Sequence, residues 1–339
     1  MNKHLLSICI PTFNRDVYID QLLESIYSQV SDQLSTYIEI CISDNASTDK
    51  TTDIIDKWQR TNKIDLIYSK NNKNIGPDLN YLRSVSLATG KYCWLMGSDD
   101  MLKPGAISRM IEEIKECHDI YICSAAECDN NMKYKKDLEW FPKGMSDTVF
   151  HFQDNAQMKK YFDNAQQLGA LFGFLSVLVI SREKWNSINY KNKYSNSAWS
   201  HTFIVLSILL QTNSTVKYIS EPLVLHRGDN DSFLIEGLIK RYLIDFNGFL
   251  MLADDFFKND REIRKSFLKV VTRDRSSRTM LYVALTIEEN DLKNVILDKM
   301  KKLPYHKLVI ISFWIVVNLP FKKYILKCFQ KIKHLYKQL

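Results

Sequence analysis

The first 125 residues predict an α/β fold in which a mostly parallel sheet is sandwiched by helices. Two observations lead to this prediction. Short apolar runs end in proline or polar residues, as buried strands do, and the segments between them carry apolar residues at helical spacing. Strand and helix alternate along the chain, an order typical of parallel sheets covered on both faces. A chain of 339 residues with 45% hydrophobic and 25% charged residues is also typical of a globular protein.

Five apolar runs predict strands, at residues 5–10, 38–43, 64–68, 92–96 and 120–123. Pro77 and Pro104 each suit the first turn of a helix. After Pro104, apolar residues follow the i, i+3, i+4, i+7 pattern from Ile107 to Ile114. Residues 171–181 predict one further strand, residues 203–211 an apolar helix, and residues 231–300 a helical C-terminal region.

Several common classes of enzyme are excluded by missing motifs. The 10 glycines form neither a GxGxxG dinucleotide fingerprint nor a phosphate-binding GxxxxGK loop. No two histidines stand four apart and no CxxC occurs, which argues against zinc hydrolases and zinc ribbons. The seven cysteines form no disulfide framework in so long a chain, so we expect a reduced, cytoplasmic protein.

The positive charge is concentrated at the C-terminal end. The net charge is +7, but residues 299–339 contain ten lysines and no acid, which leaves −3 for residues 1–298. Because a nucleic-acid-binding protein needs a basic patch on the fold itself, nucleic acid is not an expected partner.

Polar residues follow three of the predicted strands. Pro11-Thr12-Phe13-Asn14-Arg15 follows the first, a loop from Asp44 to Asp49 the second, and Gly97-Ser98-Asp99-Asp100 the fourth. Ligands of such sheets bind beyond the carboxyl ends of the strands. Acidic side chains gathered there suit a divalent cation bridging to substrate phosphates. The alternative is that these carboxylates only make turns and cap helices.

The same segments resemble a known family. SICIPTFNR, ISDNASTD, NIGPDLNYLRSVSLATG and YCWLMGSDDMLKP are similar, in order, to the nucleotide-binding half of family 2 glycosyltransferases with the GT-A fold. Within that family the chain most resembles bacterial O-antigen and surface-polysaccharide transferases, including an abequosyltransferase-like branch. The resemblance implies a glycosyltransferase domain at residues 1–230, with a nucleotide-binding half at 1–125 and an acceptor half at 126–230.

The resemblance also implies roles for particular residues. Nucleotide-sugar binding is implied for Pro11, Thr12, Asn14, Arg15, Asp44, Asn74, Gly76, Asn80, Ser98 and Asp99. Asp44 is expected to accept hydrogen bonds from the base or ribose. Asp99, with Asp100, is expected to bind Mn²⁺ or Mg²⁺ against the diphosphate. The chain departs from the family pattern at Gly97, where the first acid of the metal motif is missing, and at Leu79, where an arginine is common.

The resemblance places the catalytic base at the start of the predicted apolar helix. A Glu-Asp pair is usual there, and this chain has Ser200-His201. A histidine can take the proton of an acceptor hydroxyl near neutral pH, giving inversion at the anomeric carbon. The alternative is a histidine that only caps or packs the helix, in which case Asp163, Glu183 or Asp229 would be substitutes. Arg227 resembles the arginine of a loop that binds the diphosphate, or else belongs to a surface turn.

The C-terminal residues 301–339 predict a basic, apolar, membrane-associating tail. Residues 308–321 include no charge and are too few to span a bilayer, but they suit a segment lying in its interface. The alternative is a core helix of the C-terminal region.

The sequence therefore predicts a metal-assisted glycosyltransferase, peripherally bound at the inner membrane, with a nucleotide-sugar donor and a lipid-linked glycan acceptor. Two other functions remain open. One is a nucleotidyltransferase, although the expected glycine-rich basic loop is missing after the first strand. The other is a catalytically inactive nucleotide-binding scaffold, suggested by Gly97 and His201.

Overall fold

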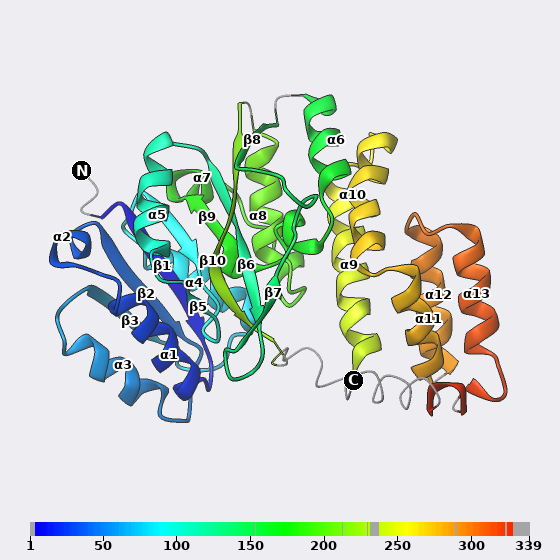
Figure 1. Cartoon of the computed structure of the whole chain (residues 1–339), viewed down its shortest axis with the longest axis horizontal. Coiled ribbons are helices and arrows are strands. Elements are labelled where there is room, and N and C mark those ends of the chain that lie inside the picture. Colours follow the sequence, from blue (N-terminus) through cyan, green and yellow to red (C-terminus); the bar gives the residue numbers. More distant parts are fainter. Residues whose placement is uncertain are drawn as a thin grey trace. The chain divides into compact units, whose positions relative to one another are not determined.

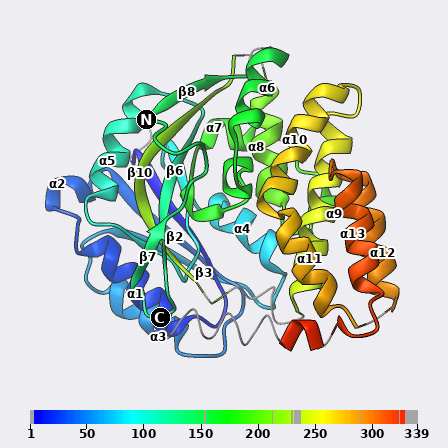
Figure 2. The same cartoon turned by 45° about the vertical axis from the view of Figure 1, so that its right-hand side comes forward.

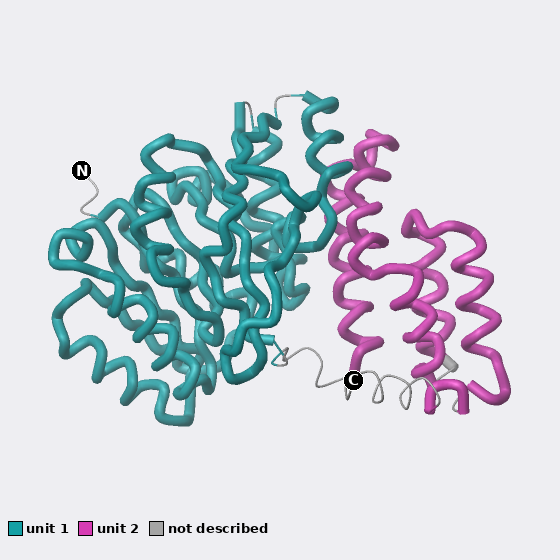
Figure 3. The backbone as a smooth tube through the Cα atoms, in the orientation of Figure 1, with its two compact units in different colours: residues 1–230 teal, residues 231–339 magenta. Residues whose placement is uncertain are grey.

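The computed structural model describes residues 4–152, 154–211, 213–228, 230, 237–288, 290–322 and 324–327. The chain divides into two compact units, residues 1–230 and residues 231–339 (Figure 3). Each unit is described by itself.

Unit 1 is built on a mixed sheet with the strand order β3-β2-β1-β4-β9-β6-β10-β5, while β7 pairs with β6 and β8 with β10 (Figure 1). The strands are β1 (Leu6–Thr12), β2 (Ile38–Asp44), β3 (Asp65–Lys70), β4 (Tyr92–Leu95), β5 (Met101–Leu102), β6 (Ile120–Cys128), β7 (Tyr134–Asp137), β8 (Thr148–His151), β9 (Leu178–Ser181) and β10 (Thr215–Arg227). Strands β3, β2, β1 and β4 run parallel, as predicted, and β6 is parallel to β10. The remaining pairings are antiparallel. The predicted α/β class is confirmed.

Helices cover both faces of this sheet. For this reason β1, β2 and β4 are buried along their whole length. The helices are α1 (Asp16–Tyr27), α2 (Asp32–Ser35), α3 (Thr51–Gln59), α4 (Pro77–Ser86), α5 (Ala106–Glu113), α6 (Asn155–Asn164), α7 (Arg182–Asn186) and α8 (Ser200–Leu209). Helix α1 packs against α3, whereas α4 packs against β1, β2 and α8. Right-handed crossovers put α1 and α3 on one face and α4 on the other, because the chain reverses its direction across the sheet between β3 and β4.

Two predicted boundaries differ from the structure. The strand predicted at residues 171–181 is only β9, because the first part forms 3₁₀ turns at Leu168–Leu171 and Leu175–Val177. The two turns are separated by Phe172, whose φ of 62° is incompatible with a strand. Most of the segment is apolar and buried, in the turns as well as in β9, so hydrophobicity alone could not separate turn from strand. The helix after Pro104 begins two residues later, at Ala106, after Gly105 in a left-handed conformation.

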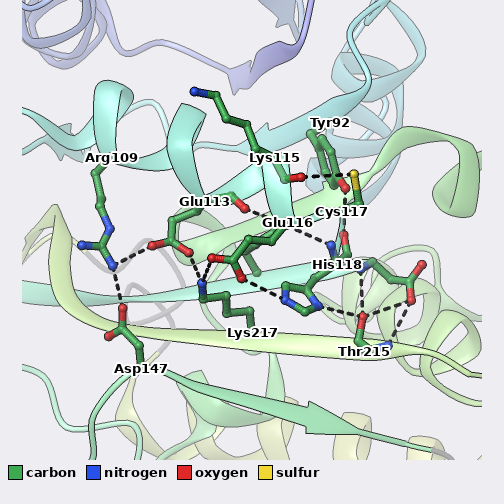
Figure 4. A network of polar contacts seen from close by, with 12 residues as sticks. Tyr92, Arg109, Glu113, Lys115, Glu116, Cys117, His118, Asp147, Thr215 and Lys217 are labelled. Atoms are coloured by element: carbon green, nitrogen blue, oxygen red, sulfur yellow. Dashed lines mark hydrogen bonds and ion pairs between the residues drawn. The ribbon is translucent and has the colours of Figure 1, made fainter.

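A partly buried ionic network lies at the amino-terminal ends of β6 and β10, where Lys217 reaches two carboxylates (Figure 4). Its Nζ lies 2.5 Å from Glu113 Oε2 and 2.6 Å from Glu116 Oε1, and Arg109 also pairs with Glu113 at 2.6 Å. Both Lys217 and Glu113 are buried. Since β6 and β10 are parallel, this network lies at the end of the sheet opposite to the loops that follow Cys128 and Arg227.

Replacing Lys217 with methionine is expected to lower the free energy of unfolding by about 3 kcal/mol, because buried negative charge is left with too few cations. Urea denaturation followed by circular dichroism measures this. The matched control is Lys115→Met, which removes an exposed lysine paired with Glu112 and should cost less than about 1 kcal/mol. Equal stability of the two variants would contradict the prediction.

Unit 2 consists, in its described part, of helices α9 (Leu238–Phe256), α10 (Arg261–Asp274), α11 (Ser277–Thr286), α12 (Asn290–Lys302) and α13 (Lys307–Val317). In its interior the buried Asp245 pairs with Arg241 and with Arg275, which is 2.6 Å away. A search of the described residues finds no helix that is both long and apolar enough to cross a bilayer. The last predicted tail residues, 328–339, lie outside the described residues.

Candidate active site

The carboxyl ends of β1 and β2 are joined by hydrogen bonds between the loops that follow them. Thr12 and Asp44 are partners in the register of the two strands. Beyond them, the Asn14 N–H donates to Ser47 Oγ at 2.9 Å, and the Thr48 N–H donates to Asn14 Oδ1 at 2.8 Å. Asn14 has a φ of 51°, a conformation that asparagine tolerates better than most residues. The first two predicted loops therefore form one structure at one sheet edge.

Asp44 lies beneath this edge and is completely buried. Its Oδ1 accepts from the Ser47 N–H at 2.9 Å, and its Oδ2 accepts from the Tyr68 hydroxyl at 2.8 Å. Burial, together with the nearby Asp44 carboxylate, raises the pKa of Tyr68 to about 12. A base or ribose reaching Asp44 must therefore displace or share one of these two donors, and the base-binding role of Asp44 stays a prediction.

The segment after β3 and the start of α4 are connected to the loops after β1 and β2 by Asn74, Gly76 and Asn80. Asn45 Nδ2 donates to Asn74 Oδ1 at 2.8 Å and to the Gly76 carbonyl at 3.3 Å. Asn80 is buried, and its Nδ2 donates to the carbonyls of Ser43 at 2.9 Å and Thr12 at 3.3 Å. In this structure these side chains hold strand ends and loops together. Any contact that they make with a nucleotide is additional to that role.

Asp99, in the loop after β4, keeps a partly accessible carboxylate at this edge, with its side chain 26% exposed. Its Oδ2 accepts from Asn230 Nδ2 at 2.8 Å and lies 3.9 Å from an Arg15 guanidinium nitrogen. Asn230 also accepts from Arg15, at 3.2 Å. Burial, followed by the negative charge of Asp100, raises the pKa of Asp99 to about 6, although Arg15 opposes the shift. The negative charge on Asp99 is thus only partly compensated by the protein.

Asp100, in contrast, is buried and surrounded by protein partners. Its Oδ2 accepts from Ser176 Oγ at 2.5 Å, and its Oδ1 lies 3.1 Å from both His226 Nδ1 and the Arg227 backbone nitrogen. A Cβ atom on Gly97 would lie 3.1 Å from Ser176 Oγ and 3.2 Å from Asp100 Oδ2. The glycine at the first position of the motif is therefore explained by the space that the Asp100–Ser176 pair occupies. Ser98, which follows Gly97 in the motif, is also buried.

Arg227 is also buried, and its guanidinium makes three hydrogen bonds to protein atoms. It donates to the carbonyl of Asp99 at 2.8 Å, to the carbonyl of Asn130 at 2.5 Å and to Gln21 Oε1 at 2.6 Å. This geometry indicates that Arg227 anchors the loop containing Asp99. It is less suited to a guanidinium that is free to bind a diphosphate. Asp229 lies outside the described residues.

His226, for which the sequence predicted no role, is the penultimate residue of β10, next to Arg227. Its side chain is 36% exposed. Although burial lowers the pKa of His226, its hydrogen bond to Asp100 and the negative charges of Asp100 and Asp99 outweigh this, and the pKa is raised above its usual value. The available signal was its position at the end of a strand, directly before a site arginine.

His201 lies in the first turn of α8 and is 4% exposed. Neither ring nitrogen makes a hydrogen bond of ordinary geometry to a described residue. Burial lowers the pKa of His201 to about 4, although the Asp78 carboxylate and the Phe172 carbonyl oppose the shift. At neutral pH the ring is therefore uncharged, the form that accepts a proton.

Tyr81 connects His201 with the acidic loop. Its ring lies edge-on to the His201 ring, with centroids 6.2 Å apart. Burial, with smaller effects of Asp78 and Asp99, raises the pKa of the Tyr81 hydroxyl well above its usual range. Glu183, a possible substitute base, follows β9 at the opposite end of the sheet, because Ser181 pairs with Tyr92 at the start of β4. Asp163 is paired with Lys159 at 2.5 Å.

Comparison with known proteins identifies the family. Residues 7–178 match the model of glycosyl transferase family 2. The chain is 38% identical over 273 residues to abequosyltransferase RfbV of Salmonella typhimurium, a match that covers 80% of this chain and 81% of that protein. The chain belongs to glycosyl transferase family 2.

Other relatives of this family 2 glycosyltransferase are more distant. It is 26% identical to a Campylobacter jejuni GalNAc(5)-diNAcBac-PP-undecaprenol beta-1,3-glucosyltransferase over 56% of this chain and 57% of that one. In structure it is similar to S. aureus TarS in complex with UDP, with a TM-score of 0.65 and 16% identity over 92% of this chain and 90% of that one. It is also similar to mannosyltransferase PcManGT from Pyrobaculum calidifontis in complex with GDP-Man and Mn²⁺, with a TM-score of 0.52 and 12% identity over 92% of this chain and 86% of that one. These two likenesses support the GT-A type of fold.

The site of this glycosyltransferase fits a divalent cation that shares its coordination with substrate phosphates. Within the described residues no three His, Cys, Asp or Glu side chains are grouped to hold a metal ion by themselves. One or two carboxylates plus phosphate oxygens are, however, the usual environment of such a cation. Asp99 offers a partly accessible carboxylate whose charge is poorly compensated.

Asp78 fixes the start of α8 relative to α4. This buried carboxylate accepts from the Ala198 N–H at 2.9 Å, from Ser200 Oγ at 2.7 Å and, at 3.4 Å, from the Ser200 N–H. Asn196 and Ala198 both have positive φ angles, near 65° and 68°, so the segment before α8 depends on such external contacts. Asp78 therefore holds His201 in place from a neighbouring helix.

The Asp78→Ala variant is expected to lose about 3 kcal/mol of unfolding free energy, because three buried donors lose their acceptor. Chemical denaturation gives the value. Asp78→Asn keeps one acceptor oxygen and should recover part of the loss. If both variants were as stable as the native protein, the bonds to the α8 start would contribute nothing to stability.

The depressed pKa of His201 also predicts a pH dependence of stability. An unfolded histidine titrates near pH 6.5, so between about pH 6.5 and about pH 4 the unfolded chain binds more protons than the folded one. Acidification through this window should remove about 2–3 kcal/mol of stability that is fully present above it. Denaturation at about pH 7.5 and about pH 4.5 should show a smaller acid loss for His201→Gln than for the native chain. An equal loss would show that His201 is not buried in its neutral form.

Proposed function

We propose that the chain transfers a sugar from a nucleotide-sugar donor to a lipid-linked glycan during synthesis of bacterial O-antigen or another surface polysaccharide. The observation that carries the proposal is the partly accessible Asp99 carboxylate beside Arg15, at the edge where three loops meet. The likeness to abequosyltransferase RfbV supports the O-antigen assignment and a hexose or deoxyhexose as the transferred sugar.

Donor binding uses the loops after β1, β2 and β4. Arg15, beside Asp99, and the adjacent backbone would bind the diphosphate, and the hydrogen-bonded loops that contain Asn14 and Ser47 would form one wall of the nucleoside site. Asp99 would hold Mn²⁺ or Mg²⁺, with His226 and Asp100 behind it. When bound, that cation would stabilise negative charge on the departing diphosphate.

Sugar transfer needs a base for the acceptor hydroxyl. In the proposed reaction a His201 ring nitrogen, which is buried in this structure and has to become accessible when the acceptor binds, takes the hydroxyl proton while that oxygen attacks the anomeric carbon. The bond from this carbon to the diphosphate oxygen breaks, its electron pair leaves with the nucleoside diphosphate, and the anomeric configuration inverts. Arg15, which lies beside Asp99, would stabilise the charge on the leaving diphosphate.

The acceptor and the location are proposed together. The name of the C. jejuni relative describes a glucosyltransferase whose acceptor is a glycan on PP-undecaprenol, and a similar acceptor here would place the reaction at the inner leaflet of the inner membrane. We infer peripheral association from the cytoplasmic side.

Calorimetry with UDP, dTDP, CDP and GDP, each with and without Mn²⁺, tests the donor site. Micromolar, metal-dependent binding of one nucleotide is expected, and Asp99→Asn should weaken it. Transfer of a labelled sugar to polyprenyl-diphosphate-linked glycan then tests the reaction. Nucleotide binding without transfer to any glycan would favour the inactive scaffold, and absence of binding would refute the donor site.

A further inference from the structure

Helix α13 is apolar on two sides, and only one side is covered. Phe313 and Val317 are buried where α13 packs against α11 and α12 (Figure 2). On the other side four large apolar side chains are exposed: Leu308 (64%), Ile311 (52%), Trp314 (56%) and Ile315 (48%). The core-helix alternative is thus realised on one face of α13, while the other face is apolar and exposed among the described residues.

The exposed side chains form a continuous stripe. Ile311 follows Lys307 by four residues and precedes Ile315 by four, so these three lie on one face of the helix, with Leu308 and Trp314 beside them. The helix has 11 residues, so the stripe runs along its whole length. Beyond its end, Phe321 and Tyr324 are exposed as well. A tryptophan with other aromatic side chains next to an aliphatic stripe is typical of residues at a membrane interface.

The charge that flanks the stripe along the chain has a single sign, although α12 carries the exposed Asp298. Residues 299–327 contain lysines and no acid, and Lys301, Lys307 and Lys327 are exposed. A second copy of the chain would bring these lysines against one another across a shared apolar face, which is unfavourable. An anionic lipid surface would instead attract the lysines while its acyl boundary covers the apolar side chains.

We propose that α13 is the membrane-docking element, lying flat in the interface of an anionic bilayer with Leu308, Ile311, Trp314 and Ile315 inserted between the lipids. This inference rests on the proposed function only in its expectation of a lipid-linked acceptor. Its geometry places the membrane contact in unit 2, and no residue of the donor site takes part.

Flotation of the full chain with vesicles tests the proposal. The native protein should float with phosphatidylcholine vesicles that contain phosphatidylglycerol, and high salt or omission of phosphatidylglycerol should weaken binding several-fold. The Ile311→Ser/Trp314→Ser double variant should bind at least about tenfold more weakly. The matched control is Tyr37→Ser, which removes a side chain of similar exposure (44%) just before β2 and should leave binding unchanged.

A second measurement does not depend on a disruptive variant. Vesicles with brominated acyl chains should quench native tryptophan fluorescence, and Trp314→Phe, which keeps an apolar ring, should float normally but lose much of the quenching. Equal flotation of the double variant, no flotation of the native chain, or a concentration-dependent dimer that only the double variant fails to form would each overturn the proposal.

Vesicle binding needs no donor or acceptor, so its result is independent of sugar transfer. Transfer to a water-soluble acceptor glycan should be equal in the native chain and the double variant. If the native chain floats with vesicles but transfers no sugar, the proposed function is refuted and the docking helix is not. If the native chain transfers sugar but does not float, only the docking helix is refuted.

Discussion

Replacing Asp99 with asparagine is expected to lower kcat/KM for sugar transfer by about 10²–10³-fold, by removing the charge that in the proposed function faces the diphosphate and its cation. Asn is nearly the same size and keeps an oxygen for the hydrogen bond from Asn230. The fold should therefore persist while metal-dependent nucleotide binding weakens. Initial rates with varied donor and Mn²⁺, together with calorimetry, separate the loss of affinity from the loss of rate.

The neighbouring carboxylate provides the comparison. Asp100 accepts hydrogen bonds from Ser176 and the Arg227 backbone, so Asp100→Asn should mainly lower stability, by about 1–3 kcal/mol. Asp298→Asn, an exposed carboxylate in α12, should change neither property. A smaller loss of activity in Asp99→Asn than in Asp100→Asn would reverse the assignment of the two residues.

His201→Gln is expected to lower kcat by about 10²–10⁴-fold, the usual contribution of a general base, with little change in the KM for donor. Glutamine is polar and of similar length but accepts no proton at neutral pH. The pH profile adds a second criterion. Because burial lowers the pKa of His201 to about 4, the free enzyme should keep its base unprotonated across the neutral range, so kcat/KM should fall only in acid.

Two controls accompany the His201 variant. Calorimetry should show unchanged nucleotide affinity, and Ser207→Ala, on the same helix, should retain activity. If His201→Gln keeps native turnover, the base lies elsewhere, with Asp229 the remaining candidate named from the sequence.

Much of the fold could be predicted because the parallel half obeys simple periodicity. Strands such as β1 and β2 are buried on both faces, so they are apolar throughout, and the helices between them show their buried faces at regular spacing. The same signal failed around Phe172, where a buried 3₁₀ segment is as apolar as a strand. The antiparallel position of β9 depends on contacts with β4 and β6 that are distant in sequence.

The candidate site shows a similar division. The motifs predicted which loops lie together at one sheet edge, because turn residues and acidic clusters are local features. They could not separate the partly accessible Asp99 from the buried Asp100, since that difference arises from Ser176 and His226, 76 and 126 residues away. The hydrogen bonds from the Arg227 guanidinium to two backbone carbonyls and to Gln21 likewise depend on the tertiary structure, so the sequence could not predict them.

The start of helix α4 links two parts of the proposed site, and this affects both the kinetics of the enzyme and its evolution. Its start contacts the donor side through Gly76, and two residues later Asp78 holds the segment that presents His201. In the proposed function, one short helix end serves substrate recognition and proton transfer together. Substitutions that destabilise this helix end should raise the KM for donor and lower kcat together. Substitutions here that change the donor preference should therefore also lower turnover.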